Sequence, residues 1–155
     1  MSSQPLGSIR LPVTGAFALP FAGYFVYLSL RVSLARIVHR VALGDTVGVA
    51  AKTPSSAAAS SPSYDSLQLA TRAHQNFAEN VPLALVLAAT AELNGATPER
   101  LATILAMLLA LRVLHAEFGL SRPDALGIGR PVGYYGTMAI VVWLASWSAW
   151  LVYRG

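Results

Sequence analysis

The sequence predicts an all-α integral membrane protein, a four-helix bundle whose helices run up, down, up and down. Of its 155 residues, 55% are apolar and only 12% are charged, which is more apolar than an average soluble domain. Two stretches, 11–30 and 131–153, contain neither a charged residue nor a histidine over 20 and 23 residues. Each is long enough to cross a hydrocarbon core of roughly 30 Å. We expect residues 1–155 to form one transmembrane domain.

The first helix is predicted over residues 12–38, with Pro12 in the first turn, where proline is tolerated. Its apolar part is too long for a typical signal-peptide core, so we expect it to be retained. The following residues, about 44–64, are rich in Ser, Ala, Pro and Gly and show no helical apolar period. This composition indicates a flexible linker.

The second helix is predicted over residues 65–94. Asp65 with Gln68 three positions later is a capping-box pattern, and Asn94 with Gly95 is a stop signal. Only residues 80–91 of this helix form an uncharged run, 12 residues long. The helix therefore spans the bilayer only if its ionisable residues lie near one interface.

The third helix is predicted over residues 98–119, with Thr97 as N-cap, Pro98 at the first helical position and Gly119 near the end. Its uncharged run, 101–111, is 11 residues long. The fourth helix is predicted over residues 131–153. Lys and Arg are more frequent in the connections after the first and third helices, which places both termini outside or in a lumen.

Charge and cysteine content exclude several kinds of site. The net charge is +4, but the basic residues are scattered around apolar segments, so we expect no nucleic-acid partner. There is no cysteine, which excludes disulfides and thiolate metal sites, and we expect no bound metal.

Polar residues are predicted at one depth, on the cytoplasmic side, on all four helices. On the second helix Arg72, Asn76 and Glu79 share a face, whereas His74 points almost opposite. The other helices contribute Arg31, Arg112, His115, Arg130 and Tyr134. Because ionisable side chains are costly at membrane depth, this convergence predicts a polar pocket that opens sideways to lipid.

The residue types in this pocket suit a ligand with two carboxylates, one ammonium and a thiol. Arginine binds carboxylates bidentately, a glutamate accepts from an ammonium, and a cation beside a thiol favours the thiolate. Glutathione has these groups.

Structural roles compete with this interpretation. Arg72 and Glu79 also suit an intramembrane pair that holds helices together, and His115 suits a buried hydrogen-bonded residue. His74 is expected at the interface or packed against another helix. Glu117 with Arg122 is expected to form a solvated loop edge.

The string RAHQNFAENVPL at 72–83 resembles the second-helix signature of the MAPEG family, the membrane-associated proteins of eicosanoid and glutathione metabolism. LRVLHAEFGLS at 111–121 and GRPVGYYG at 129–136 support the resemblance, which is closest to less characterised bacterial and fungal members. It implies a homotrimer of four-helix protomers that binds glutathione between subunits near the cytoplasmic side.

Carried over to this sequence, the resemblance implies glutathione-binding positions and catalytic positions. The expected binding residues are Arg72, Asn76, Glu79, His115 and, as a weaker match, Arg31; the expected catalytic residues are Arg130, which would assist thiolate formation, and Tyr134. Two positions depart from the family pattern. Gln75 stands where some synthases have a second arginine, and Gly119 stands where a tyrosine is expected.

These observations predict a membrane-bound glutathione-dependent transferase or peroxidase that acts on lipophilic electrophiles or lipid hydroperoxides. The alternative is a noncatalytic lipid-binding or scaffold protein of the same family. A small transporter is a third class, disfavoured because the polar residues occupy one layer. The expected location is the endoplasmic reticulum or another endomembrane in a eukaryote, or the inner membrane in a bacterium, as a multi-pass protein.

Overall fold

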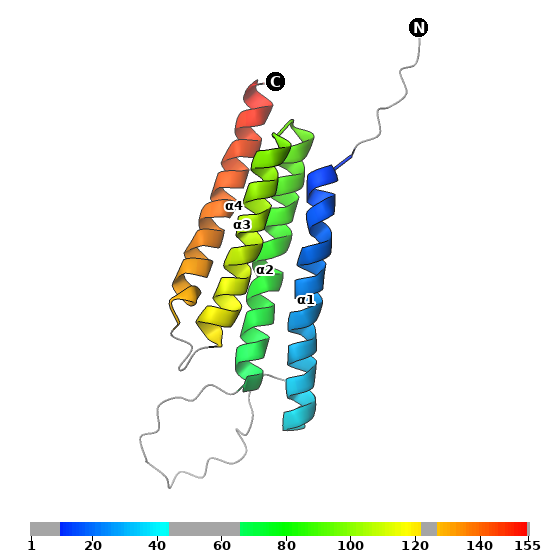
Figure 1. Cartoon of the computed structure of the whole chain (residues 1–155), viewed down its shortest axis with the longest axis vertical. Coiled ribbons are helices and arrows are strands. Elements are labelled where there is room, and N and C mark those ends of the chain that lie inside the picture. Colours follow the sequence, from blue (N-terminus) through cyan, green and yellow to red (C-terminus); the bar gives the residue numbers. More distant parts are fainter. Residues whose placement is uncertain (1–9, 44–65, 122–126, 155) are drawn as a thin grey trace.

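The computed structural model describes residues 10–43, 66–121 and 127–154, and within these ranges every regular element is a helix (Figure 1). The helices are α1 (Pro12–His39), α2 (Ser66–Leu93), α3 (Pro98–His115) and α4 (Gly129–Arg154), and α3 continues into a π-helical turn, η2 (Ala116–Leu120). The all-α, four-helix prediction is confirmed. The predicted linker at 44–64 and the predicted cap Asp65 lie outside the described residues.

Consecutive helices run antiparallel, so the start of α1 and the end of α4 lie at the same end of the bundle (Figure 1). Helix α1 packs against α2 and α3, and α4 packs against the same two helices. The starts of α2 and α4 and the end of α3 therefore meet at the opposite end. This is the end at which the sequence places its polar layer.

Three helical segments are long and apolar enough to cross a membrane: Pro12–His39, Pro98–Leu120 and Gly129–Arg154. Helix α2 has 28 residues, as many as α1, but it carries more polar side chains. The chain is thus a membrane protein by helix length and composition. That α2 also spans the bilayer stays a prediction.

The inner face of α2 is built mainly from small residues. Ala84, Ala88 and Ala91 are fully buried and recur at intervals of three or four residues, so they form one face of the helix. Leu101, Leu105, Leu108, Leu144 and Leu28 from the other helices fill the space around them. The middle of the bundle is therefore apolar, and polar groups gather at its ends.

The start of α1 is capped by a carboxylate from another helix. Glu92, near the end of α2, accepts hydrogen bonds from the main-chain N–H groups of Val13 (2.7 Å) and Thr14 (2.9 Å). The first N–H groups of a helix have no partner within it, and they carry partial positive charge. Glu92 satisfies two of them and joins α1 to α2 at the end opposite the polar layer.

Helix α2 ends where the sequence predicts. Gly95 has a φ of +86°, the Ala96 N–H donates to the Ala91 carbonyl, and the Gly95 N–H donates to the Glu92 carbonyl. These two bonds form a Schellman motif, in which glycine adopts the left-handed conformation without strain. Thr97 is the N-cap of α3, but its hydroxyl makes no capping bond.

Helices α3 and α4 approach each other closely through glycine. A Cβ built on Gly133 would lie 2.5 Å from the His115 Cβ and 2.6 Å from the Leu111 carbonyl oxygen. A Cβ on Gly119 would meet the Arg130 main chain in the same way. The predicted α-helix through residue 119 widens into the π-helical turn η2 after His115. The Gly119 main chain thereby comes to lie against the first turn of α4.

Candidate functional site

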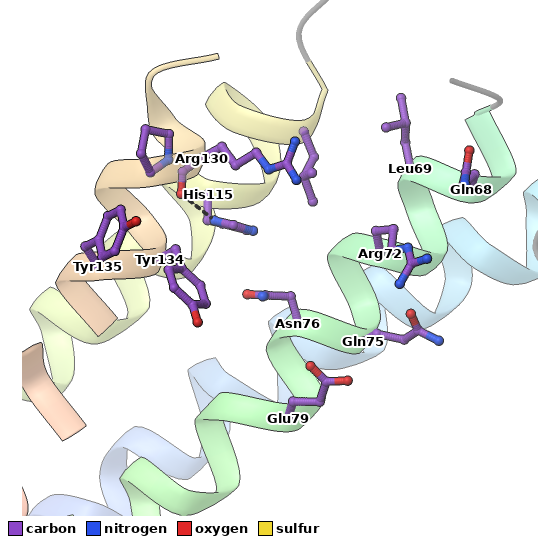
Figure 2. A pocket seen from close by; sticks show the side chains of 12 residues that line it. Gln68, Leu69, Arg72, Gln75, Asn76, Glu79, His115, Arg130, Tyr134 and Tyr135 are labelled. Atoms are coloured by element: carbon purple, nitrogen blue, oxygen red, sulfur yellow. Dashed lines mark hydrogen bonds between the residues drawn. The ribbon is translucent and has the colours of Figure 1, made fainter. Parts of the chain in front are cut away.

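A cavity of about 770 Å³ opens between the start of α2 and the start of α4. Residues from three helices line it: Gln68, Leu69, Arg72, Gln75, Asn76, Glu79, His115, Leu120, Arg130, Pro131, Tyr134 and Tyr135. Figure 2 shows the α2 side chains on one wall and the α3 and α4 side chains on the other. Six of the seven residues predicted for the site line this one cavity.

The α2 wall is a stripe of polar side chains at helical spacing. Arg72, Asn76 and Glu79 lie on the side of α2 that faces the cavity, as the helical phase predicts (Figure 2). Gln68 and Gln75 extend the same stripe and were absent from the predicted site. Gln68 lies four residues before Arg72, and Gln75 lies seven residues after Gln68. This helical spacing is the sequence signal that places both residues on the face of Arg72.

The opposite wall is built from the end of α3 and the start of α4. The His115 Nδ1 lies 2.9 Å from the main-chain carbonyl oxygen of Arg130, which connects the two helices. Figure 2 shows the His115 ring and the Arg130 side chain extending from this wall towards α2, with Tyr134 one turn further along α4. Tyr135 and Pro131 add apolar surface at this side.

A buried arginine, Arg112, lies behind the cavity and connects three helices. Its guanidinium donates to the Asn76 side-chain oxygen on α2 and to the Gly133 carbonyl oxygen on α4. Only 2% of Arg112 is exposed. The sequence placed Arg112 in the polar layer on one face with His115, but not among the binding residues. In the structure, Arg112 fixes the orientation of the Asn76 side chain by donating to its oxygen.

Arg31 lies outside the cavity. Its guanidinium forms an ion pair with Glu117 at 2.6 Å, and Glu117 also accepts a hydrogen bond from the Tyr24 hydroxyl at 3.3 Å. The expected loop edge of Glu117 with Arg122 is therefore wrong for Glu117, which joins η2 to α1, and Arg122 lies outside the described residues. The cause is tertiary packing, because α1 lies beside α3 and brings Arg31 to this carboxylate.

Two further expectations concern α2. His74 packs against α1, where its ring lies 4.9 Å from the Phe25 ring, so it points away from the cavity as predicted. Within the part of the chain that the structure describes, no ion pair joins Arg72 to Glu79. Both side chains instead lie at the cavity.

The comparison with protein families identifies the family of the chain. Residues 14–150 match the MAPEG family, and the match covers α2 and α3, most of α1 and α4, and every residue of the cavity wall. None of the curated proteins compared with the chain matches it. The extent of the family match, over an all-α bundle with apolar helices, shows that the chain belongs to the MAPEG family.

Proposed function

We propose that this protein is a membrane-bound glutathione-dependent transferase or peroxidase. Its second substrate is a lipophilic electrophile or a lipid hydroperoxide that arrives from the bilayer. The observation that carries the proposal is the single cavity with guanidinium groups on opposite walls, from Arg72 and Arg130, and a carboxylate from Glu79. The family membership of the chain supports the same class of ligand.

The charges of the cavity match those of glutathione. Arg72 and Arg130 each offer a fork of N–H donors for a carboxylate or a thiolate. Glu79 accepts from the α-ammonium. Glutathione is small compared with a cavity of about 770 Å³, so space is left for part of a second substrate beside Tyr134 and Tyr135.

The thiol reacts as the thiolate, and a neighbouring cation favours that form. Arg130 is in the position to supply this charge, because its side chain extends into the cavity from the first turn of α4 (Figure 2). Tyr134 lies one turn later on the same helix and offers a hydroxyl donor. Arg130 is thus the proposed activating residue and Tyr134 its partner.

The proposal includes a homotrimer in the membrane. Many large apolar side chains of the helices are exposed in the single chain, among them Phe25, Leu34, Val86, Val142 and Trp150. In a bilayer such side chains contact lipid or neighbouring subunits. Native mass spectrometry from mild detergent measures the number of chains directly.

Binding is tested by thermal unfolding of the purified protein in detergent with increasing glutathione. A ligand that binds only the folded state stabilises it, by about 2.7 kcal/mol at roughly 100 times Kd. We expect saturable stabilisation that is lost in Arg72→Ala. The matched control is Arg100→Ala, which removes an exposed arginine from the opposite end of the bundle and should leave the stabilisation unchanged.

Catalysis is tested separately with 1-chloro-2,4-dinitrobenzene and with a lipid hydroperoxide. We expect turnover that falls strongly in Arg130→Ala while glutathione still binds. Stabilisation by glutathione without turnover on either substrate class would reject the enzymatic part of the proposal and keep the binding part.

One observation favours the second candidate, a noncatalytic lipid-binding or scaffold protein. Two expected ligand residues already make contacts within the protein: Asn76 accepts from Arg112, and Arg31 pairs with Glu117. The two candidates differ in the effect of Glu79→Gln. A scaffold loses assembly or thermal stability in the absence of ligand, whereas a glutathione site loses only the stabilisation that the ligand brings.

A further inference from the structure

The two ring nitrogens of His115 differ in their partners. Nδ1 lies 2.9 Å from the main-chain carbonyl oxygen of Arg130. A carbonyl oxygen only accepts, so Nδ1 carries the hydrogen and donates it. In the uncharged ring, a hydrogen on Nδ1 leaves Nε2 unprotonated with its lone pair available. The fold of the chain therefore selects one tautomer of His115.

The unprotonated nitrogen faces the cavity. His115 is one of the lining residues, and Figure 2 shows its ring extending from the α3 wall towards α2. The ring is held at its base, because the His115 Cβ packs against the main chain at Gly133 with no room for even a methyl group between them. Only 6% of His115 is exposed. Nε2 is thus an acceptor in a fixed position.

The proposed chemistry removes the proton of the thiol, which passes either to water or to a base that lines the cavity. Arg72 and Arg130 cannot take it, because a guanidinium is already protonated. Glu79 lies on the α2 wall and is assigned to the ammonium of the ligand. The Tyr134 hydroxyl carries its own proton. Among the ionisable residues that line the cavity, His115 alone combines a lone pair with a fixed orientation.

We propose that His115 is a catalytic residue of this site and that its Nε2 accepts the thiol proton of bound glutathione. This inference rests on the proposed function, because it requires a thiol in the cavity. Arg130 keeps the task proposed above, which is to stabilise the thiolate by its charge. The main-chain carbonyl of the same residue holds the base, so one turn of α4 positions both groups.

The step conserves protons and electrons. The S–H bond breaks, its electron pair stays on sulfur, and an N–H bond forms at Nε2. With 1-chloro-2,4-dinitrobenzene the thiolate forms a C–S bond, the C–Cl bond breaks, and chloride leaves with the electron pair. The imidazolium then releases its proton to water, which restores the original tautomer.

The decisive variant is His115→Asn. The asparagine side-chain N–H₂ lies near the place of Nδ1, so it keeps the donor for the Arg130 carbonyl, but no atom replaces Nε2. His115→Gln is the complementary variant, with an amide near the place of Nε2 that has no basicity. The measurements are the ultraviolet absorbance of enzyme-bound thiolate and kcat/KM, each as a function of pH.

We expect both variants to bind glutathione but to form bound thiolate only at higher pH than the wild type. Near neutral pH, kcat/KM should fall by about 10²-fold, within the range that a general base contributes, and should recover as the pH rises. The other charged or titratable residues that line the cavity are Arg72, Glu79, Arg130, Tyr134 and Tyr135, and the charge of Arg112 also acts on His115. Arg72→Ala should lower affinity for glutathione.

Two results would overturn the inference. One is a His115→Asn variant that forms bound thiolate at the same pH and reacts at the same rate as the wild type, which would show that the charge of Arg130 is sufficient to form the thiolate. The other is a ¹⁵N NMR spectrum of histidine-labelled wild type in which Nε2 of His115 carries the hydrogen; the variant spectra assign His115 among the three histidines. If wild-type protein shows no stabilisation by glutathione, the proposed function fails first and the inference falls with it.

Discussion

At the scale of single residues, the cavity depends on a side chain that does not line it. Arg112 is buried and donates to both the Asn76 side chain and the Gly133 carbonyl oxygen. Hydrogen bonds to acceptors offset the cost of burying a guanidinium. Without Arg112 the Asn76 side-chain oxygen loses this donor, whereas the Gly133 carbonyl oxygen still accepts from the Thr137 hydroxyl at 2.8 Å. Arg112 therefore determines which atoms of Asn76 are turned towards a ligand. With Asn76 Oδ1 held by Arg112, the Asn76 amide N–H₂ is the part that remains for the cavity.

We predict that Arg112→Met destabilises the protein by about 1–3 kcal/mol, because the Asn76 side-chain oxygen loses its donor, whereas the Gly133 carbonyl oxygen keeps the Thr137 hydroxyl. Equilibrium unfolding in mixtures of mild detergent and dodecyl sulfate measures this change. Arg112→Lys is the matched variant. Its ammonium can donate to one of the two acceptors, so the decrease in the free energy of unfolding should be smaller than in Arg112→Met. An Arg112→Met protein that unfolds at the wild-type dodecyl sulfate fraction would contradict the prediction.

At the scale of helices, the α3–α4 contact positions the cavity wall that carries His115 and Arg130. Gly133 has the His115 Cβ and the Leu111 carbonyl directly against it, so an added methyl group must push α4 away from α3. The Arg130 carbonyl would then leave the His115 Nδ1. The geometry of the proposed base thus depends on the absence of a side chain at Gly133, about one turn into α4.

We predict that Gly133→Ala lowers stability by about 1–3 kcal/mol, as overpacking of a filled contact does. Gly23→Ala is the control, because a Cβ at Gly23 meets nothing within 4 Å and alanine favours the helix. Gly23→Ala should be neutral or more stable in the same unfolding measurement. Equal destabilisation of both variants would show that the effect comes from helix propensity or the lipid-facing surface, not from the α3–α4 contact.

Local signals in the sequence predict the helix ends well. Proline restricts the backbone of its own residue to a conformation that suits a first helical turn, and glycine adopts the left-handed conformation that ends a helix. Pro12 and Pro98 begin α1 and α3, and Gly95 ends α2 through its left-handed conformation. Helical phase also predicts that Arg72, Asn76 and Glu79 face one cavity, since a regular helix fixes the angle between them.

Contacts between distant segments escape this reasoning. The Glu92 carboxylate caps α1 from 79 residues away in the sequence, and the Arg31–Glu117 pair joins residues 86 apart. No local pattern states which helix lies beside which, so Arg31 was predicted at the cavity and Glu117 at a loop edge. The π-helical turn η2 is likewise set by packing of Gly119 against Arg130 rather than by propensity.

At the scale of the whole molecule, one end of the bundle is polar and its middle is apolar. The fully buried leucines and alanines occupy the centre, whereas the residues of the cavity lie where α2 and α4 begin. In a bilayer this arrangement brings the cavity close to one interface. In the proposed function a water-soluble thiol enters there, and a lipophilic substrate reaches the same cavity from the side, through the hydrocarbon phase.

The proposed trimer makes a final prediction about which chain supplies each residue. Arg72 and Arg130 line the same cavity within one chain, so each site should use both arginines of a single protomer. When Arg72→Ala and Arg130→Ala chains are co-expressed with different tags and mixed trimers are isolated by both tags, every site then lacks one arginine. Glutathione-dependent turnover should therefore stay at the level of the single variants. If neighbouring chains instead shared the two arginines across their interface, some sites in the mixed trimer would regain both, and turnover would rise above that level. Restored turnover would thus move the catalytic centre from within the protomer to the contact between protomers.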